Sequence, residues 1–395
     1  MSPTNSNTIR SLKILLHAGF FVSGIATVLI GQVLPILAQK FSLDDERTGI
    51  FFPAQFAGSL IGTFLTNWFG KRNRFLLASL LGCLLMGAGV LMLNFASYEL
   101  CLVAFAVNGL GIGLTLPSIN MLILELNRAR AAASLSVLNF FWGLGAIICS
   151  LTVYKFSREI GFLPISLSLA IPLFAIAAFL MFIPQGIEQK PGAAEEEPAD
   201  DFSTPIWTNP IAWMIAGFNF IHVGFESAIG GWLPTYSERL ENQTIVWWLA
   251  PTFLYFVFFV VGRGVAPLFF QFLNENKMLF LGLLTILLGM GILLFARNVW
   301  LLSIGASIAG FGTSSVFPTN MSRFTKTFGA SASRRATPFF ICGTLGAAFT
   351  TWFIGYISNR HANDLRSGMF ILLGSIVVLI FLQIILQFQK KAALA

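Results

Sequence analysis

The sequence predicts an all-α membrane protein with twelve transmembrane helices arranged as two pseudo-symmetric bundles of six. Of its 395 residues, 56% are hydrophobic and only 10% are charged, whereas a soluble domain has about 25% charged residues. Apolar segments of about 20 residues, the length that crosses a bilayer, recur along the whole chain. The pattern of the first half also returns in the second half, which is typical of carriers built from two repeats.

Twelve apolar segments are the predicted spans, and clusters of turn residues and charges such as Ser42–Arg47 and Gly70–Arg74 separate them. The first segment lacks a cleavage pattern after a short apolar stretch, so we expect a retained helix and not a signal peptide. In chain order, the spans are residues 12–38, 48–70, 75–95, 99–124, 131–154, 162–185, 207–236, 245–272, 278–296, 299–322, 336–359 and 366–388.

The internal repeat appears at three places with nearly one offset. Residues 18–40 and 216–239 both contain Ala-Gly-Phe, then a glycine, then Leu-Pro, then a basic residue five positions on. Two shorter echoes follow, in which Gly111-x-Gly113 is matched by Gly310-x-Gly312 and Leu144-Gly145-Ala146 by Leu345-Gly346-Ala347. Three pairs of similar motifs, in the same order in both halves, favour a duplicated bundle over coincidence.

An acidic stretch interrupts the apolar pattern in the middle of the chain, with the sequence QGIEQKPGAAEEEPADDFSTP. Such a composition cannot bury a core and predicts a flexible cytoplasmic tether, although its acidic residues could instead bind a partner or a metal. The predicted organisation is an N-terminal bundle (1–185), this linker (186–206) and a C-terminal bundle (207–395).

Basic residues predict the orientation of the chain. With both termini in the cytoplasm, the inner segments hold 15 of the 24 Lys and Arg residues and the outer loops hold 8, while Arg263 lies inside a span. Basic residues favour the cytoplasmic side, so we expect cytoplasmic termini in the inner (plasma) membrane. The net charge of +7 then reflects topology, and no nucleic-acid partner is expected.

A thiol-labelling experiment tests this orientation. Single cysteines in residues 186–206, in a background without the four native cysteines, should resist impermeant thiol reagents added to intact cells, because the basic bias places this segment inside. A cysteine beside Arg297, in a predicted outer loop, serves as the reactive control. Rapid labelling of the linker would reverse the orientation.

The loop between the second and third spans ends in Gly70-Lys71-Arg72. It resembles the signature G-x-x-x-D-R-x-G-R-R of the major facilitator superfamily, with Asn67 at the family's Asp, Trp68 at its Arg and a threonine at its first Gly. In that family the Asp helps to latch a cytoplasmic gate. The resemblance therefore implies a cytoplasmic gate at Asn67, Gly70, Lys71 and Arg72, weakened because an amide brings no charge.

Together with the spans, the linker and the repeat, this loop identifies the chain as a member of the superfamily over essentially its whole length. The resemblance implies a secondary carrier that works by rocker-switch alternating access. Residues 139–146 resemble the fifth helix of fucose-type and sodium-glucose-type sugar porters, and residues 224–236 resemble their seventh helix. These motifs imply import of a sugar or a similar small, neutral, polyhydroxylated solute.

Glu226 is the one carboxylate predicted to lie well inside a span. An ionised carboxylate in the bilayer costs about 2.5 kcal/mol or more, so it usually faces a cavity and has a function. Asn219, His222 and Glu226 are spaced i, i+3, i+7 and share one helix face. We expect proton coupling at Glu226, His222 and Arg263. The alternatives are a static ion pair, a packing histidine and an arginine that caps a cytoplasmic gate.

Amides and tryptophans inside the spans are the candidate substrate-binding residues. An amide both donates and accepts hydrogen bonds, as a sugar hydroxyl does, and an indole offers a flat apolar face to a pyranose ring. Intramembrane amides also tie helices together, which is the alternative for each of them. The candidates are Gln32, Gln55, Asn120, Asn139, Trp142, Asn219, Asn320 and Trp352, with Asn108 in the same constellation and Asn139 and Gln32 preferred.

No enzyme, cofactor or metal site is expected. The sequence has no Walker loop, no H-E-x-x-H and no G-x-S-x-G, and none of its four cysteines lies in a C-x-x-C pair. The expected partners are a small-molecule substrate, a proton or a sodium ion, and the lipid bilayer, with the protein acting as a monomer. Two other functions stay open: an exporter of amphipathic drugs or lipids, and a receptor or scaffold that does not transport.

Overall fold

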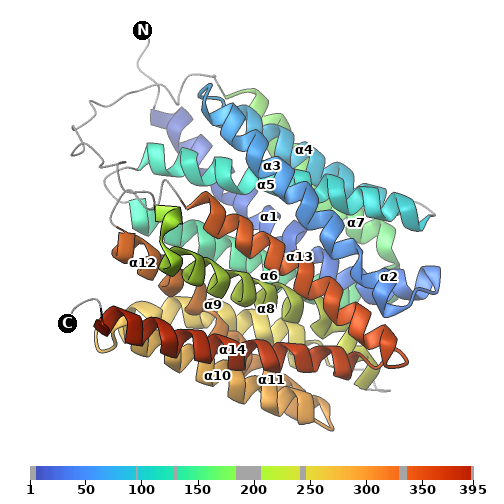
Figure 1. Ribbon diagram of the computed structural model, residues 1–395. Helices are drawn as coiled ribbons and strands as arrows, with labels where there is room; N and C mark the ends of the chain where they lie inside the picture. The colour runs from blue at the N-terminus through green and yellow to red at the C-terminus, as the bar shows by residue number, and fades with distance from the viewer. Residues whose placement is uncertain are drawn as a thin grey trace. The chain divides into compact units, whose positions relative to one another are not determined.

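The fold is described from a computed structural model (Figure 1), which covers residues 6–94, 97–127, 131–183, 206–240, 246–328 and 336–392. Within these ranges the regular elements are helices, and no strand is formed. The chain divides into two compact units. The first contains described residues of Met1–Val33 and Ile50–Ala193, and the second those of Leu34–Gly49 and Ala194–Ala395.

The first unit is built from long helices of mainly apolar residues. α3 and α4 both pack against α5, and α4 also packs against α7. Ser97 precedes α5 as its N-cap: its side chain accepts a hydrogen bond from the backbone N–H of Leu100 and satisfies one of the free donors of the first turn. The helices are α1 (Ser6–Phe41), α3 (Phe51–Gly70), α4 (Phe75–Met92), α5 (Tyr98–Leu126), α6 (Ala131–Ile160) and α7 (Phe162–Met181). Only the part of α1 up to Val33 belongs to this unit.

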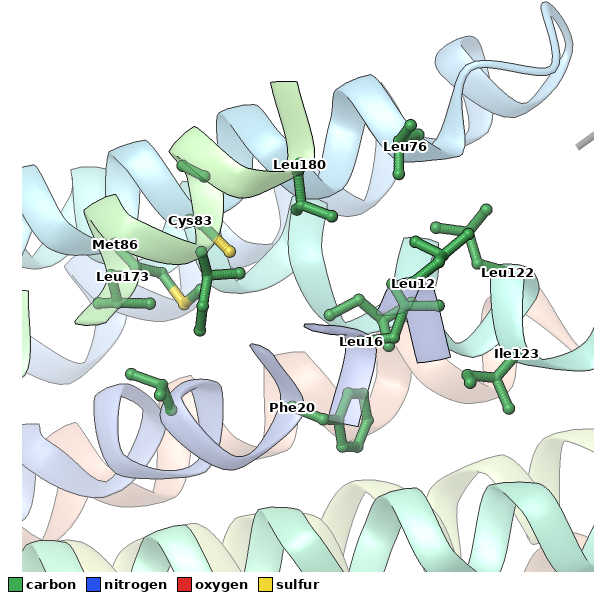
Figure 2. Packing of buried hydrophobic residues seen from close by; sticks show 14 of the residues in the cluster. Leu12, Leu16, Phe20, Leu76, Cys83, Met86, Leu122, Ile123, Leu173 and Leu180 are labelled. Atoms are coloured by element: carbon green, nitrogen blue, oxygen red, sulfur yellow. The ribbon is translucent and has the colours of Figure 1, made fainter. Parts of the chain in front are cut away.

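Apolar side chains from α1, α4, α5, α6 and α7 form the core of this unit (Figure 2). Aliphatic side chains dominate it, and Cys83 lies among them as a small buried residue. Because lipid is as apolar as leucine, close packing between helices supplies much of the association energy. Figure 2 labels Leu12, Leu16, Phe20, Leu76, Cys83, Met86, Leu122, Ile123, Leu173 and Leu180.

The second unit contains the remaining helices and also the connection that follows α1. α8 packs against α13 and α14, α9 against α11, and α10 against α11 and α14. Asn274 and Asn298 cap α10 and α11 by accepting hydrogen bonds from backbone N–H groups. Its elements are α2 (Asp45–Gly49), η2 (Ile206–Thr208), α8 (Pro210–Leu240), η3 (Trp247–Leu249), α9 (Pro251–Phe269), α10 (Glu275–Phe295), α11 (Val299–Thr313), α12 (Val316–Phe328), α13 (Thr337–Arg360) and α14 (Leu365–Ala392).

Each predicted span corresponds to helical structure, so the predicted all-α membrane fold is confirmed. Among the described residues, 11 helical segments are long and apolar enough to cross a membrane. α8 is long enough but is not among them, and its middle carries Asn219, His222 and Glu226. The seventh predicted span therefore carries polar side chains in the middle of a long helix.

Two predicted spans are each broken into two helices. The span 48–70 becomes α2 and α3, because Pro53 in the first turn of α3 has no N–H to continue the hydrogen-bond ladder from Gly49. The span 299–322 becomes α11 and α12, with a turn at residues 314–315. There the Ser314 hydroxyl donates to the Phe311 carbonyl, a back-bond that bends helices.

The sequence echo at Gly145 and Gly346 corresponds to one type of helix contact in both units. A Cβ added to Gly145 of α6 would overlap the carbonyl oxygen of Phe21 in α1. A Cβ added to Gly346 of α13 would overlap the carbonyl oxygen of Phe220 in α8. In each unit, glycine therefore lets two backbones meet, as small residues do at helix interfaces in membranes.

The division of the chain differs from the predicted domains at one place. Residues 34–49 were expected in the N-terminal bundle, yet their contacts group them with the second unit. The predicted linker, residues 186–206, lies outside the described residues apart from Ile206, which begins η2. The domain boundaries therefore stay a prediction.

Candidate functional site

A polar cluster lies on successive turns of α8. Asn219 and His222 are buried, and the side chain of Glu226 is 25% exposed. Nε2 of His222 lies 3.5 Å from Oε2 of Glu226, one helical turn away. Nδ2 of Asn219 donates to the Phe339 carbonyl of α13 at 2.9 Å. The structure therefore brings together the two titratable groups that the sequence placed on one face.

α9 supplies the positive charge of this cluster. Glu226 acts electrostatically on both Arg263 and Tyr255, so all three side chains share one region of the second unit. The guanidinium carbon of Arg263 lies 4.2 Å from the ring centroid of Phe259, and Phe259 stacks on Tyr255 with centroids 6.2 Å apart. Sequence reasoning missed Tyr255, although its spacing of four residues from Phe259 and eight from Arg263 was a usable signal.

Several polar atoms in this cluster have no hydrogen-bond partner within the described protein. They are both ring nitrogens of His222, Oδ1 of Asn219 and Nε of Arg263. Buried polar atoms in native proteins nearly always have a partner, whether protein, water or ligand. These atoms can therefore bind the hydroxyl groups of a solute or a water molecule, and they adjoin a carboxylate that can carry a proton.

The candidate amides of the first unit differ in how they are used. Nε2 of Gln55 donates to Oδ1 of Asn108 at 2.9 Å, so these two amides tie α3 to α5. Nε2 of Gln32 and Oδ1 of Asn120 are buried without a hydrogen-bond partner in the described structure. Asn139 is exposed, and its Nδ2 donates to the Leu135 carbonyl of its own helix at 2.9 Å. Nε2 of Gln32 is therefore still available as a hydrogen-bond donor, whereas Nε2 of Gln55 already donates within the protein.

The remaining candidates lie in helix contacts. Asn320 donates to the Ile215 carbonyl of α8 at 3.3 Å and also accepts from Arg323. Trp142 and Trp352 are half-buried. The indole of Trp352 lies 5.5 Å from the ring of Tyr356 within an aromatic group on α13. Asn320 is thereby engaged by protein groups at both ends of its amide.

The loop at the end of α3 has an internal contact between a cation and an indole ring. Asn67, Lys71 and Arg72 are exposed. The guanidinium carbon of Arg72 lies 3.8 Å from the ring centroid of Trp68, which occupies the family's Arg position. A cation held over an indole face is stabilised by about 0.5–1 kcal/mol at an exposed site. Gly70 lies beneath the ring of Phe75, where a Cβ would come within 2.6 Å of it.

Arg323, one residue beyond the predicted span 299–322, lies within α12. Its Nη1 donates to Oε1 of Gln383 in α14 at 2.6 Å, and its guanidinium carbon lies 4.8 Å from the ring centroid of Phe218 in α8. Nearby, Lys326 and Glu275 form an ion pair at 2.7 Å. This polar network joins four helices of the second unit.

No group of three His, Cys, Asp or Glu side chains suited to a metal occurs among the described residues. Cys83, Cys101 and Cys149 are buried and Cys342 is half-buried, and all four are free. The polar cluster itself offers groups for hydrogen bonding, charge pairing and proton transfer.

Comparisons with known proteins agree with this architecture. The sodium-dependent glucose transporter 1 of Xenopus laevis is 24% identical over 374 residues, which cover 86% of this chain and 74% of that protein. The glucose/mannose transporter GlcP of Bacillus subtilis (strain 168) is 22% identical over 381 residues and 94% of both chains. The fold resembles the inward open conformation of the xylose transporter XylE from E. coli, with a TM-score of 0.73, 15% identity and 95% of each chain covered.

The model of the family described as Major Facilitator Superfamily matches residues 16–337, which is most of the chain. The multi-pass helical fold and the transporter relatives agree with that match and indicate a transporter and not an enzyme. This chain belongs to the Major Facilitator Superfamily.

Proposed function

We propose that this transporter imports a sugar or a similar small, neutral, polyhydroxylated solute together with protons, by rocker-switch alternating access. It acts as a monomer in the inner membrane, with both termini in the cytoplasm. The observation that carries the proposal is the cluster of Glu226, His222 and Arg263 in the second unit, where a carboxylate and an imidazole lie 3.5 Å apart.

The charges of this cluster support proton coupling. An ionised Glu226 is balanced by the positive field of Arg263, whereas protonation of Glu226 leaves that arginine uncompensated. Charges inside a membrane are costly when unbalanced, so we expect gain or loss of the proton at Glu226 to be tied to the contacts of Arg263. His222 adjoins the same carboxylate and can share the proton, because an imidazole nitrogen can accept and donate one.

The polar atoms around Glu226 support a neutral, hydroxyl-rich substrate. Asn219 and His222 carry free hydrogen-bonding capacity on the helix face that also holds the carboxylate. A substrate that bonds these atoms changes the surroundings of Glu226, which links the two binding events. The relatives named for glucose, mannose and xylose make hexoses and pentoses the first candidates.

A thermal-shift screen of the purified protein tests the substrate class. Glucose, mannose, xylose, polyols, organic acids and lipophilic amines are compared, with L-glucose as a stereochemical control. A true ligand at 100 times its Kd stabilises the folded state by about 2.7 kcal/mol, so a neutral sugar should raise the unfolding midpoint. A shift with lipophilic compounds alone would favour the exporter. Binding without flux in liposomes would favour a receptor or scaffold.

Removing the preferred amides should weaken substrate binding. Gln32→Ala and Asn139→Ala are each expected to raise the Kd about 5- to 150-fold, because an unpaired polar partner in an occluded site costs about 1–3 kcal/mol. Isothermal titration with the best sugar of the screen measures the effect. Asn94→Ala is the control, since its amide bonds Ser166 within the fold. Parental affinity in both variants would identify the two amides as packing residues.

A further inference from the structure

The guanidinium of Arg263 has no hydrogen bond and no ion pair to any group in the described part of the chain, and its Nε is buried without a partner. Two other arginines of the second unit are bound by protein groups. Arg239 donates to the carboxylate of Asp45 at 2.7 Å, and Arg323 donates to the amide of Gln383 at 2.6 Å. A guanidinium carries several N–H donors in one plane. Arg263 therefore keeps donors that the protein itself does not use.

Aromatic rings of α9 fix the place of this guanidinium. Its carbon lies 4.2 Å from the ring centroid of Phe259, in a cation–π contact. Phe259 stacks in turn on Tyr255, with the ring planes 21° apart, and Tyr255 meets Phe256 edge-on at 5.3 Å. Tyr255 and Phe259 are both buried, and buried side chains are closely packed. The orientation of the guanidinium is therefore set by a packed stack of rings and not by hydrogen bonds.

The backbone beside Arg263 is packed as closely as its side chain. A Cβ added to Gly262 would overlap Oγ of Ser314 and would lie 3.0 Å from the carbonyl oxygen of Phe311, so a larger residue would push α9 away from α11. This contact limits the rotation of α9 and keeps Arg263 within the field of Glu226.

Glu226 provides hydrogen-bond acceptors in the same region. Its charge acts on Arg263, yet the two groups do not form an ion pair, so their charged atoms are more than about 4 Å apart. Because a hydroxyl group both accepts and donates, a polyol between these side chains can accept from Arg263 and donate to Glu226. The formal charges of the two side chains cancel, which favours a neutral ligand over an anionic one.

We propose that Arg263 binds two adjacent hydroxyl groups of the substrate, with its guanidinium oriented by the ring of Phe259. The inference rests on the proposed function and names the part of the sugar that the polar cluster recognises. Two parallel N–H groups can donate to the two oxygens of a vicinal diol, as they do to the two oxygens of a carboxylate. In this diol contact Arg263 determines specificity, and Phe259 is a positioning residue.

The diol contact is tested by the binding of D-glucose and of each of its monodeoxy analogues, measured by isothermal titration. The parent protein should bind the two analogues that lack one hydroxyl of the bound pair about tenfold more weakly than glucose. Arg263→Lys keeps the positive charge near Glu226 but loses the planar fork. It should therefore bind glucose about tenfold more weakly than the parent does and no longer distinguish glucose from those two analogues.

Substitutions of Phe259 test its positioning role. Phe259→Leu should reduce the same discrimination between glucose and the two analogues, because the guanidinium loses the ring that orients it. Phe259→Tyr keeps the ring and should retain the discrimination. Phe258→Leu is the matched control on the same helix, since the Phe258 side chain is 39% exposed, and it should bind every sugar as the parent does.

Chemical modification of the parent protein gives a second measurement that needs no variant. Phenylglyoxal reacts with accessible guanidinium groups, and mass spectrometry follows its addition to Arg263. Glucose far above its Kd should slow this addition about tenfold or more, because nearly every site is then occupied. Addition to Arg297, which is exposed just before α11, should proceed at an unchanged rate.

Three results would overturn the diol contact. If Arg263→Lys weakens glucose and all its monodeoxy analogues equally, or if bound glucose leaves the modification of Arg263 unchanged, the contact is wrong while sugar binding stands. If glucuronate binds the parent more tightly than glucose, Arg263 binds a carboxylate and not a diol. If no neutral sugar binds the parent, the proposed substrate class is wrong and the diol contact falls with it.

Discussion

The Glu226→Gln variant is expected to lose accumulation driven by a pH gradient while keeping substrate exchange across liposome membranes. Glutamine copies the shape of the protonated acid but cannot release a proton. Exchange without a gradient needs only the proton-bound half-cycle, so it should continue near the parental rate. Because the cluster would keep a permanently neutral partner for Arg263, gradient-driven uptake should fall to the level of protein-free liposomes.

Uptake and counterflow are measured on the same reconstituted preparation. Glu99→Gln is the control, because Glu99 is an exposed carboxylate in the first turn of α5 and should not affect coupling. If Glu226→Gln accumulates substrate at the parental level, Glu226 is not the coupling site. A uniporter, or coupling at another group, would then replace the proposed mechanism.

The Gly346→Ala variant is expected to be strongly destabilised, by about 3 kcal/mol. The new Cβ meets the carbonyl oxygen of Phe220 and not a flexible side chain, so α8 and α13 must separate along their contact. Overpacking of a well-packed interface costs about 1–3 kcal/mol, and a clash between two backbones belongs at the upper end. The unfolding midpoint in detergent should fall accordingly, and ligand binding near Glu226 should weaken with it.

Gly217→Ala on α8 is the matched control for this variant. No atom lies within 4 Å of a Cβ added there, and alanine favours helix over glycine by up to about 1 kcal/mol. The control should therefore unfold at the parental temperature or slightly above it. If Gly346→Ala is as stable as Gly217→Ala, a Cβ at position 346 does not force α8 and α13 apart, and the stability of the protein does not depend on their close approach.

Much of the candidate site could be predicted from the sequence because it follows from local rules. The spacing of His222 and Glu226 places them one turn apart on any helix, and the structure finds them in contact. The hydrogen-bond partners of an amide do not follow from its position in the sequence. Gln55 and Asn320 are candidates from the sequence as Gln32 is, although Gln32 is preferred, and their amides are bonded within the fold.

The membrane class, the places of the spans and the superfamily follow from the sequence, since hydropathy and repeated motifs act along the chain. Which distant groups meet follows from the packing of the helices. Asp45 meets Arg239, 194 positions later, residues 34–49 group with the second unit, and Arg323 joins a network with Gln383. Such pairings depend on how helices pack side by side, and the periodicity of one helix carries no information about its neighbour.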